Sequence, residues 1–385
     1  MPSPSSRAVP DVVMLRTRAF PPEPRGLREA RALRGDGFSV QVVAWDRARK
    51  FPARETIEGI EVVRVRVPCG ESLFPAYLVA LPVFWLRAIM RCLRNDVRVV
   101  HCADLDTLPV GLLAKKLRGK KVVYDAYEDY SGMVATVVPA AVASFLSRLD
   151  RRLSRGADLV VSVSPPLLER YAGVRDTLLV PNASDPEEFD RVTEEEALSF
   201  RREHGVGGEF MLLFVGVLMP GRGIEQCIAA TEGMDGVKFV IGGFGQIEAE
   251  VRRLASASKN SVFIGAVKPD AVPRAVRAAD ALVEVLDPSN GTYRVSMPNK
   301  LFESLMAGIP FIVSRETYPG RFVEEHGTGI AVPFGDEVAL RDAIVLLKGQ
   351  KGSVDWKERS SRIRDRYAWK GFARSLVDAY RRLLA

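Results

Sequence analysis

Lys300 and Glu303 are the residues of this sequence whose types and spacing most plainly suggest chemistry. They stand three residues apart in SMPNKLFESLMAGIPFIV (296–313), after a Pro-Asn pair and before a run of small apolar residues. The pattern predicts a helix that Asn299 caps and Gly308 ends, with both charged side chains in its first turn. A helix N-terminus with an added ammonium suits an anion, and a carboxylate one turn further suits a sugar diol. The alternative is an ion pair on a surface helix.

A glycine-rich loop in GVLMPGRGIEQCIAA (216–230) is a second candidate for anion binding. A strand is expected to end at Val217 and a helix to begin near Ile224, with Arg222 set between two glycines. Glycines let a ligand approach the backbone, the helix start offers unpaired N–H groups, and a guanidinium adds a forked charge for a phosphate. Together with Lys300, this loop would bind a diphosphate. The alternative is a tight turn with one exposed arginine.

Strand-like runs alternate with helical stretches along the whole chain and would position both motifs. Short β-rich runs separated by helices predict parallel strands with crossover connections, and hence α/β sheets of the doubly wound, Rossmann-like kind. The expected strands are residues 11–15, 39–45, 60–67, 97–104, 120–128, 157–164, 177–182, 211–217, 237–243, 261–267, 281–286, 310–314 and 329–334. Two such sheets would bind ligands at the carboxyl ends of their strands, across a cleft between two domains.

The length of 385 residues favours two domains. We expect a first domain over 1–183, a linker with a polar helix over 184–208, a second domain over 209–365 and a closing helix over 366–385. The linker is inferred from a charged stretch without β-branched runs. The first residues, MPSPSSRAVP, show no charged and then apolar leader, and a short loose lead into the first strand is expected.

The net charge of +7 is carried by the beginning of the chain. Residues 1–100 hold 17 Lys and Arg against 10 Asp and Glu, which is the whole surplus. A basic region favours anionic partners such as nucleic acid, an acidic membrane surface or a phosphorylated substrate. Since no helix-turn-helix, zinc-finger or RNP-like motif accompanies the charge, nucleic acid is not expected as a partner.

The longest apolar run, residues 73–86, is 14 residues long and contains two prolines. A bilayer-spanning helix needs about 20 residues, so the run is too short to cross a membrane. Four arginines follow it at near-helical spacing, namely Arg87, Arg91, Arg94 and Arg98. An apolar segment followed by a basic helical face, as in 73–98, can lie in a membrane interface as a peripheral contact. The alternative is a partly buried helix with a solvated arginine face.

The four cysteines are widely scattered and form no CxxC pair. That usage predicts reduced thiols in a cytoplasmic protein, and neither zinc ligands nor a disulfide frame. The expected location is the cytoplasm, with the inner face of the membrane as the place where the segment 73–98 would act.

Across nearly its whole length the sequence resembles the retaining glycosyltransferases of the group 1, or family 4, type, which have the GT-B architecture. The resemblance rests on the joint order of RAFPPEPRGLREARALRGDGFSVQVVAW, VVHCADLDTLPVGLLAKK, VVYDAYEDY, ADLVVSVSPPL, LLVPNASDPEEF, FVGVLMPGRGIEQCI, PNKLFESLMAGIPFIVS and YAWKGFARSLVDAY. It implies two Rossmann-like domains that face each other across a cleft, with the last helix crossing back to the first domain.

The resemblance implies roles for the residues that would bind the donor diphosphate. Arg222 falls where the family has a diphosphate-binding Lys or Arg. Asn299 and Lys300 fall where backbone amides meet the diphosphate. Gly26, in the first strand-to-helix connection, falls near the glycine loop that lets acceptor and donor phosphate approach.

The nucleoside end of the donor is assigned in the same way. Glu303 falls on the second Glu of the family's E-x7-E motif, which holds the ribose, and Ser296 is expected to contact ribose or sugar. Val267 falls near the backbone that reads the nucleobase.

The chain departs from the family in both domains. In the first domain, Ala103 and Tyr127 stand where the family often has His. In the second domain, the Arg common after the first strand is Val217, and the first Glu of the E-x7-E motif is Val295. The usual carboxylate on the donor sugar is therefore missing.

The resemblance also implies a retaining transfer, in which the leaving diphosphate carries the developing negative charge. Arg222, Lys300 and helix amides would stabilise it without a metal, and no cofactor is expected beside the donor, a UDP- or GDP-linked sugar. Near the acceptor, the catalytic candidates are His101, Asp104 and Glu128, expected at the carboxyl ends of first-domain strands. The alternatives are a strand-end histidine bonded to backbone for His101, and helix caps for the two carboxylates.

We therefore expect a hexosyltransferase that moves a sugar to a hydroxyl of a lipid-linked or cell-surface glycan, acting as a monomer or weak dimer. A soluble acceptor is an alternative. Two rival functions remain, a non-catalytic nucleotide-sugar-binding or partner protein of the same fold and a UDP-sugar epimerase of the GT-B architecture. A nicotinamide-dependent dehydrogenase is not expected, because no GxGxxG opens a helix after the first strand.

Overall fold

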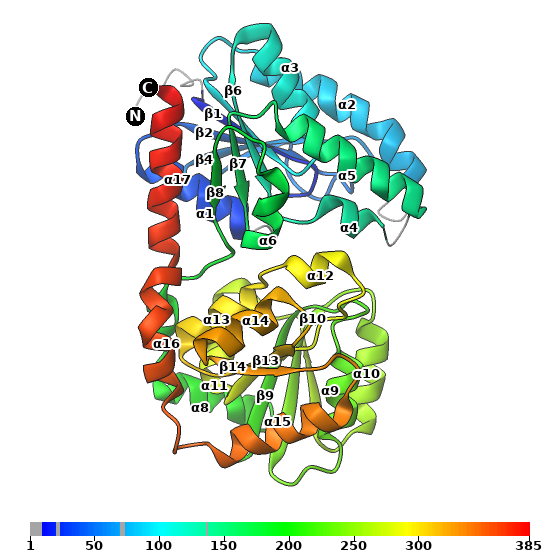
Figure 1. Cartoon of the computed structure of the whole chain (residues 1–385), viewed down its shortest axis with the longest axis vertical. Helices are drawn as coiled ribbons and strands as arrows, with labels where there is room; N and C mark the ends of the chain where they lie inside the picture. The colour runs from blue at the N-terminus through cyan, green and yellow to red at the C-terminus, as the bar shows by residue number, and fades with distance from the viewer. Residues whose placement is uncertain (1–9, 21–23, 70–73, 136–137) are drawn as a thin grey trace. The chain divides into compact units, whose positions relative to one another are not determined.

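The computed structural model describes residues 10–20, 24–69, 74–135 and 138–385 (Figure 1). The chain forms two compact units, one made of Met1–Pro181 with Phe372–Ala385 and the other of Asn182–Gly371. Each unit is a mainly parallel sheet with helices packed against it. The lead expected at residues 1–9 and the first residue of the apolar run, at 73, lie outside the described residues.

The first unit contains an eight-stranded sheet in the order β3-β4-β2-β1-β5-β6-β7-β8. Its strands are β1 (Val12–Arg16), β2 (Val40–Trp45), β3 (Arg54–Ile57), β4 (Ile60–Val65), β5 (Val99–Ala103), β6 (Lys121–Ala126), β7 (Leu159–Ser162) and β8 (Thr177–Leu179). Its helices are α1 (Pro24–Gly35), α2 (Phe74–Cys92), α3 (Leu108–Arg118), α4 (Tyr130–Val134), α5 (Ala140–Ser154), α6 (Pro165–Leu168) and η1 (Glu169–Tyr171). The direction of winding reverses between β1 and β5, so the switch point of this sheet lies at their carboxyl ends.

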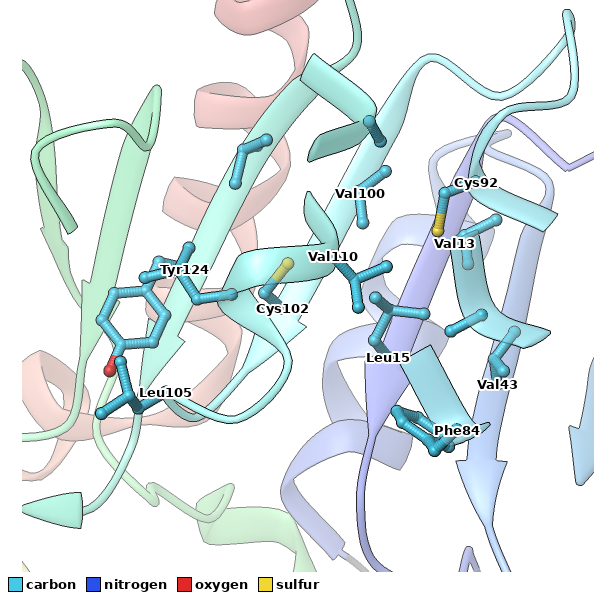
Figure 2. Packing of buried hydrophobic residues seen from close by; sticks show 14 of the residues in the cluster. Val13, Leu15, Val43, Phe84, Cys92, Val100, Cys102, Leu105, Val110 and Tyr124 are labelled. Atoms are coloured by element: carbon cyan, nitrogen blue, oxygen red, sulfur yellow. The ribbon is translucent and has the colours of Figure 1, made fainter. Parts of the chain in front are cut away.

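The apolar core of this unit lies between the sheet and the helices that cover it. Figure 2 shows side chains from strands, such as Val13, Val100 and Tyr124, packed with Phe84 of α2 and Val110 of α3. The strands β1, β2, β5 and β7 are buried along their whole length, as expected for parallel strands covered on both faces. All four cysteines are buried free thiols.

The sequence analysis misses one strand, β3, which pairs antiparallel with β4. A tight turn at Glu58 and Gly59 joins the two strands, and both turn residues have positive φ, 52° and 79°. The strand is short, and its side chains alternate between half-buried and exposed, so no apolar run marks it. The Glu-Gly pair between RETI and IEVV is the signal that could have found it.

The second unit contains a six-stranded parallel sheet in the order β11-β10-β9-β12-β13-β14. Its strands are β9 (Phe210–Val217), β10 (Val237–Phe244), β11 (Ser261–Gly265), β12 (Ala281–Glu284), β13 (Phe311–Ser314) and β14 (Gly329–Val332). Its helices are α7 (Pro186–Asp190), α8 (Glu194–Glu203), α9 (Ile224–Thr231), α10 (Glu248–Ala257), η2 (Pro269–Ala271), α11 (Val272–Ala278), α12 (Gly291–Val295), α13 (Asn299–Ala307), α14 (Tyr318–His326), α15 (Glu337–Gly349), α16 (Trp356–Arg364) and η3 (Asp365–Tyr367). Its switch point lies between β9 and β12.

The stretch expected as a linker, 184–208, is part of this second unit. It forms α7 and α8, and α8 packs against α11. Arg201 of α8 is buried, donates to the Ala278 carbonyl at 2.8 Å and pairs with Asp280 at 3.2 Å. The linker expectation is therefore wrong, because a charged, polar-looking helix can still dock through one buried arginine.

Most of the last helix, α17 (Trp369–Leu384), belongs to the first unit. Tyr380 is fully buried there, and its hydroxyl lies 2.6 Å from Nδ1 of His101. Arg381 pairs with Asp36 through Nε at 2.9 Å. The expected fold class is confirmed in these features: two doubly wound α/β sheets and a last helix that returns to the first domain.

Candidate functional site

The carboxyl ends of β9 and β12, the switch point of the second sheet, gather two cations around one carboxylate. Glu284, the last residue of β12, is fully buried. Its Oε1 accepts a hydrogen bond from Nη1 of Arg222 at 2.8 Å and another from Nζ of Lys300 at 3.1 Å. Arg222 comes from the glycine-rich loop after β9, and Lys300 comes from the first turn of α13. We call these three residues the cation cluster, which has a surplus of one positive charge.

The carboxylate of the cation cluster stays ionised. Burial alone would raise the pKa of Glu284, but attraction to Lys300 and then to Arg222 lowers the pKa below its ordinary value. The second carboxylate oxygen, Oε2, is buried and has no hydrogen-bond partner among the described residues. Glu284 therefore orients both cations and retains the capacity to accept one more hydrogen bond.

Lys300 can reach Glu284 because the neighbouring strand β9 has a glycine, Gly216, where the lysine side chain passes it. A Cβ at Gly216 would lie 2.7 Å from Nζ of Lys300, so a side chain there would displace the ammonium. Nζ also lies 4.4 Å from the ring centroid of Phe214, within the range of a cation–π contact. Lys300 is thus a buried cation directed at the switch point, and the alternative of a surface ion pair does not describe it.

The helix that carries Lys300 begins one residue earlier than the expected cap implies. Pro298 occupies the N-cap with φ −69° and ψ 153°, and Asn299 is the exposed first residue of α13. The expectation that Asn299 caps the helix is wrong, because the change from extended to helical backbone falls at Pro298. Gly308 ends the helix in the left-handed conformation, φ 71°, as expected.

The residues expected at the nucleoside end of a donor lie in the same unit. Glu303 is half-buried in α13, and Ser296 ends α12, where its hydroxyl donates to the Tyr293 carbonyl at 3.3 Å. Val267 follows β11 and packs against Gly242 of β10. Its Cγ2 lies 2.7 Å from the position that a Cβ on Gly242 would occupy. Contacts of these side chains with ribose, sugar or base stay predictions.

Glu284 is the residue of this site that the sequence analysis misses. It stands inside the apolar run ALVEVL (281–286). An acidic residue in a buried strand is rare unless it is paired, and this is the signal that could have found it. Its partner Lys300 lies 16 residues further along the chain, in a different element.

The switch point of the first sheet gathers a second group of polar residues. Asp104, after β5, is buried and has a left-handed backbone, φ 62°, which in a residue other than glycine is strained and typical of functional sites. Glu128, after β6, pairs with Arg18 at 3.2 Å. Burial and then repulsion by Glu128 raise the pKa of Asp104 well above its ordinary value. Neither carboxylate is a helix cap, since Thr107 and Asp129 occupy those positions.

His101 does not join this group. It lies inside β5, and its side chain is fully buried. Nδ1 faces the Tyr380 hydroxyl at 2.6 Å, and Nε2 lies 3.6 Å from a carboxylate oxygen of Glu29 and 3.6 Å from one of Asp125. Its own unit encloses the side chain, so the burial gives no support to the expected catalytic role, which stays a prediction. The alternative of a backbone bond is wrong, since the ring meets side chains.

Two arginines complete the buried network around His101. Arg25 forks to Asp125 with bonds of 2.7 and 3.2 Å, and Arg16 lies 3.4 Å from Glu29. Within the described part of the chain, Glu29, His101 and Asp125 form one group whose ligand atoms are close enough to hold a metal ion. Because guanidinium groups already stand against both carboxylates, the arrangement suits a salt-bridge network better than a metal site.

Gly26 lies in the first turn of α1 and is buried there. The sequence analysis placed it in the connection before that helix, which is wrong by a few residues. Residues 21–23 of that connection fall outside the described part of the chain. A contact between Gly26 and a diphosphate stays a prediction.

Comparison with known proteins identifies similar families for both units. Residues 22–183 match the family model described as a glycosyl transferase 4-like domain, and residues 209–349 match the model described as glycosyl transferases group 1. Together the two matches span most of the chain. No curated protein sequence matches it significantly.

Several solved structures share the fold over nearly the whole chain. Sucrose-phosphate synthase from Thermosynechococcus elongatus is 18% identical with a TM-score of 0.75, covering 97% of this chain and 99% of that one. HepE from Anabaena, solved with UDP-glucose, is 15% identical with a TM-score of 0.72, covering 96% and 99%. WaaG, a glycosyltransferase involved in lipopolysaccharide biosynthesis, is 14% identical with a TM-score of 0.67, covering 96% and 99%. At these identities the likeness is one of fold.

Removing the negative charge of the cation cluster should destabilise the protein. Glu284→Gln keeps the shape of the side chain but leaves the buried Lys300 without its counter-ion. We expect the free energy of unfolding, measured by urea denaturation, to fall by about 3–5 kcal/mol. Glu250→Gln breaks an exposed pair with Arg253 in the same unit and should change stability little. A loss in Glu284→Gln as small as in this control would contradict the pairing.

The buried network should anchor the last helix. Tyr380→Phe keeps the ring and removes the hydroxyl that faces His101, so we expect a loss of about 1–2 kcal/mol in unfolding free energy. Hydrogen exchange of residues 372–385 should become faster. Tyr293→Phe is the control, since its hydroxyl makes a long bond of 3.4 Å at the surface. Unchanged exchange in Tyr380→Phe would show that other contacts hold the helix.

Proposed function

Because the chain belongs to the group 1 glycosyltransferases of the GT-B fold, which use nucleotide sugars, we propose that it is a retaining, metal-independent hexosyltransferase. It moves a sugar from a nucleotide diphosphate sugar to a hydroxyl group of an acceptor. The observation that carries this proposal is the cation cluster of Arg222, Glu284 and Lys300. It lies at the switch point of the second sheet, where doubly wound folds bind their ligands.

Stabilisation of the leaving diphosphate is the main electrostatic task of this reaction. As the bond between sugar and diphosphate breaks, negative charge grows on the phosphate oxygens, and preorganised cations there lower the barrier. Arg222 is the more exposed of the two cations, with 23% of its side chain accessible, and its fork fits two phosphate oxygens. Lys300 and the backbone amides at the start of α13 supply further positive charge.

A UDP-linked sugar is the first donor to test, with a GDP-linked sugar second. HepE from Anabaena has been solved with UDP and with UDP-glucose, and its likeness in fold supports a UDP-linked donor here. On this chain we assign Glu303 and Ser296 to the ribose or sugar and Val267 to the base. Asn299 meets the diphosphate through its backbone amide.

Asp104 and Glu128 are the residues we assign to the acceptor side. Burial first, and then repulsion by Glu128, raises the pKa of Asp104. This favours its proton-bearing form, which could donate a hydrogen bond to an acceptor oxygen. Glu128, paired with Arg18, can accept one. The proton of the attacking hydroxyl passes to the departing diphosphate, so this mechanism requires no strong base on the protein.

Binding of nucleotide sugars tests the proposal directly. UDP-glucose or a GDP-linked sugar should raise the melting temperature of the wild type. Arg222→Ala and Lys300→Ala should weaken binding about 10–100-fold and abolish the shift, since each removes a charge-assisted bond. Arg253→Ala, which removes an exposed arginine of the same unit, is the control. No shift with any donor, or equal shifts in all variants, would favour a non-catalytic role.

The acceptor is proposed to be a lipid-linked or cell-surface glycan that the protein meets on an anionic membrane. Three packed helices of the first unit, α2, α3 and α5, support this (Figure 1). Their exposed large apolar side chains are Leu78, Val79, Val83, Leu86 and Met90 on α2, Leu113 and Leu117 on α3, and Val142 and Phe145 on α5. We call this surface the membrane face. WaaG, similar in fold, takes part in lipopolysaccharide biosynthesis.

The charge of the membrane face suits anionic lipid. Its basic residues are Arg87 and Arg91 on α2, Lys115, Lys116 and Arg118 on α3, and Arg148, Arg151 and Arg152 on α5. The sequences of α2 and α3 contain no acidic residue, and the one in α5, Asp150, is buried between two tyrosine hydroxyls. Such a surface binds by apolar insertion and by attraction to lipid headgroups. Among the described residues, no helix has the length and apolar character that crossing a bilayer requires.

Binding to vesicles tests the membrane face. The protein should sediment with vesicles that contain phosphatidylglycerol and remain in solution with phosphatidylcholine alone. Replacing Leu86 and Met90 with serine should weaken binding about tenfold or more, because both side chains would leave the apolar phase. Val345→Ser with Leu346→Ser, at equally exposed sites on α15, is the control. Equal binding to both kinds of vesicle would contradict the proposal.

A further inference from the structure

A large aromatic side chain stands exposed at the carboxyl end of β10. Phe244 is the last residue of that strand, and 56% of its surface is accessible. Carboxyl ends of parallel strands next to a switch point are where this kind of sheet binds ligands. An exposed phenylalanine at such a place forms an apolar platform that neither the cation cluster nor the fold requires.

The backbone on both sides of Phe244 is fixed by close contact with β9. A Cβ on Gly243 would collide with the backbone oxygen of Gly216, and a Cβ on Gly245 would collide with that of Leu218. The amide of Leu218 donates to the Phe244 carbonyl at 2.8 Å. The two glycines therefore allow the main chain to lie against β9, and Phe244 is presented from a rigid segment. A rigid platform loses little entropy when a ligand binds.

The order of strands places Phe244 between two positions already assigned to the donor. Along the edge β11-β10-β9-β12, the strand ends carry Val267, Phe244, Val217 and Glu284. Phe244 and Val217 are register partners, and Val217 is also exposed. With strands about 4.8 Å apart, Phe244 lies roughly 10 Å from the end of β12, where the cation cluster begins. The ribose of a nucleotide spans a comparable gap between its base and its diphosphate.

We propose that Phe244 is the surface on which the nucleobase of the donor stacks. The inference rests on the proposed function, because it assumes that the diphosphate binds at the cation cluster. A base has a planar π face, and stacking on an aromatic side chain is favourable for every base. The register partner of Phe244, Val217, is exposed and apolar, so the ring and the base would meet with no charged side chain at that strand end.

The test compares ligands with and without a base. Affinities of UDP, GDP, ADP and inorganic pyrophosphate are measured by calorimetry on the full chain. Phe244→Ala should weaken the nucleoside diphosphate that the wild type binds best by about tenfold and leave pyrophosphate unchanged. Phe244→Tyr should bind like the wild type. Val345→Ala is the control, because Val345 is an apolar side chain of the same unit with the same 56% exposure.

A second readout does not depend on affinity. In the wild-type complex, the base protons of the bound nucleotide should shift upfield in the NMR spectrum because they lie over an aromatic ring. In Phe244→Leu, which keeps an apolar side chain, that shift should disappear.

The outcomes separate this inference from the proposed function. If Phe244→Ala weakens pyrophosphate as much as the nucleotide, the residue supports the diphosphate loop and the stacking proposal falls. If Phe244→Ala changes neither ligand while Arg222→Ala abolishes binding, the function stands and the stacking proposal falls. If the wild type binds no nucleoside diphosphate at all, both are overturned.

Discussion

Ionised groups at the ends of buried parallel strands need partners inside the protein, and both units are organised by this requirement. Moving an unpaired charge out of water costs far more free energy than a single hydrogen bond contributes. In the second unit, Glu284 meets Arg222 and Lys300, and in the first unit Asp125 meets Arg25. Each pairing joins different elements of the chain. The loops and helix starts that carry these residues are therefore fixed as firmly as the strands.

The two units differ in whether their paired charges leave a net charge that a ligand could bind. Around His101, two arginines are matched by two carboxylates, and Tyr380 of the last helix covers the ring. That network is enclosed. Around Glu284, two cations share one carboxylate, and Arg222 remains partly exposed. An anion gains from the second arrangement and not from the first, which is why the donor site is assigned to the second unit.

The sequence was sufficient to predict the strands other than β3 and two of the three residues of the cation cluster. Apolar runs between helices mark every strand except β3, whose side chains alternate and whose short hairpin leaves no run. Lys300 and Arg222 could be found because helix starts and glycine loops bind anions by local geometry. An acidic residue inside an apolar run could have marked Glu284, but its two partners could not be predicted, since the pairing depends on strand order. The burial of His101 could not be predicted for the same reason, because its partner Tyr380 lies 279 residues away.

Val217 and Val295, where the resemblance to the family leads us to expect charged residues, would change the character of the proposed donor site without removing it. Both residues are apolar. Val217 stands beside Phe244 in the register of β9 and β10, so the exposed surface there is continuous and apolar. The remaining positive charge is concentrated in the cation cluster. Charge at the diphosphate and apolar contact at the base would then divide donor recognition between neighbouring strand ends of one sheet.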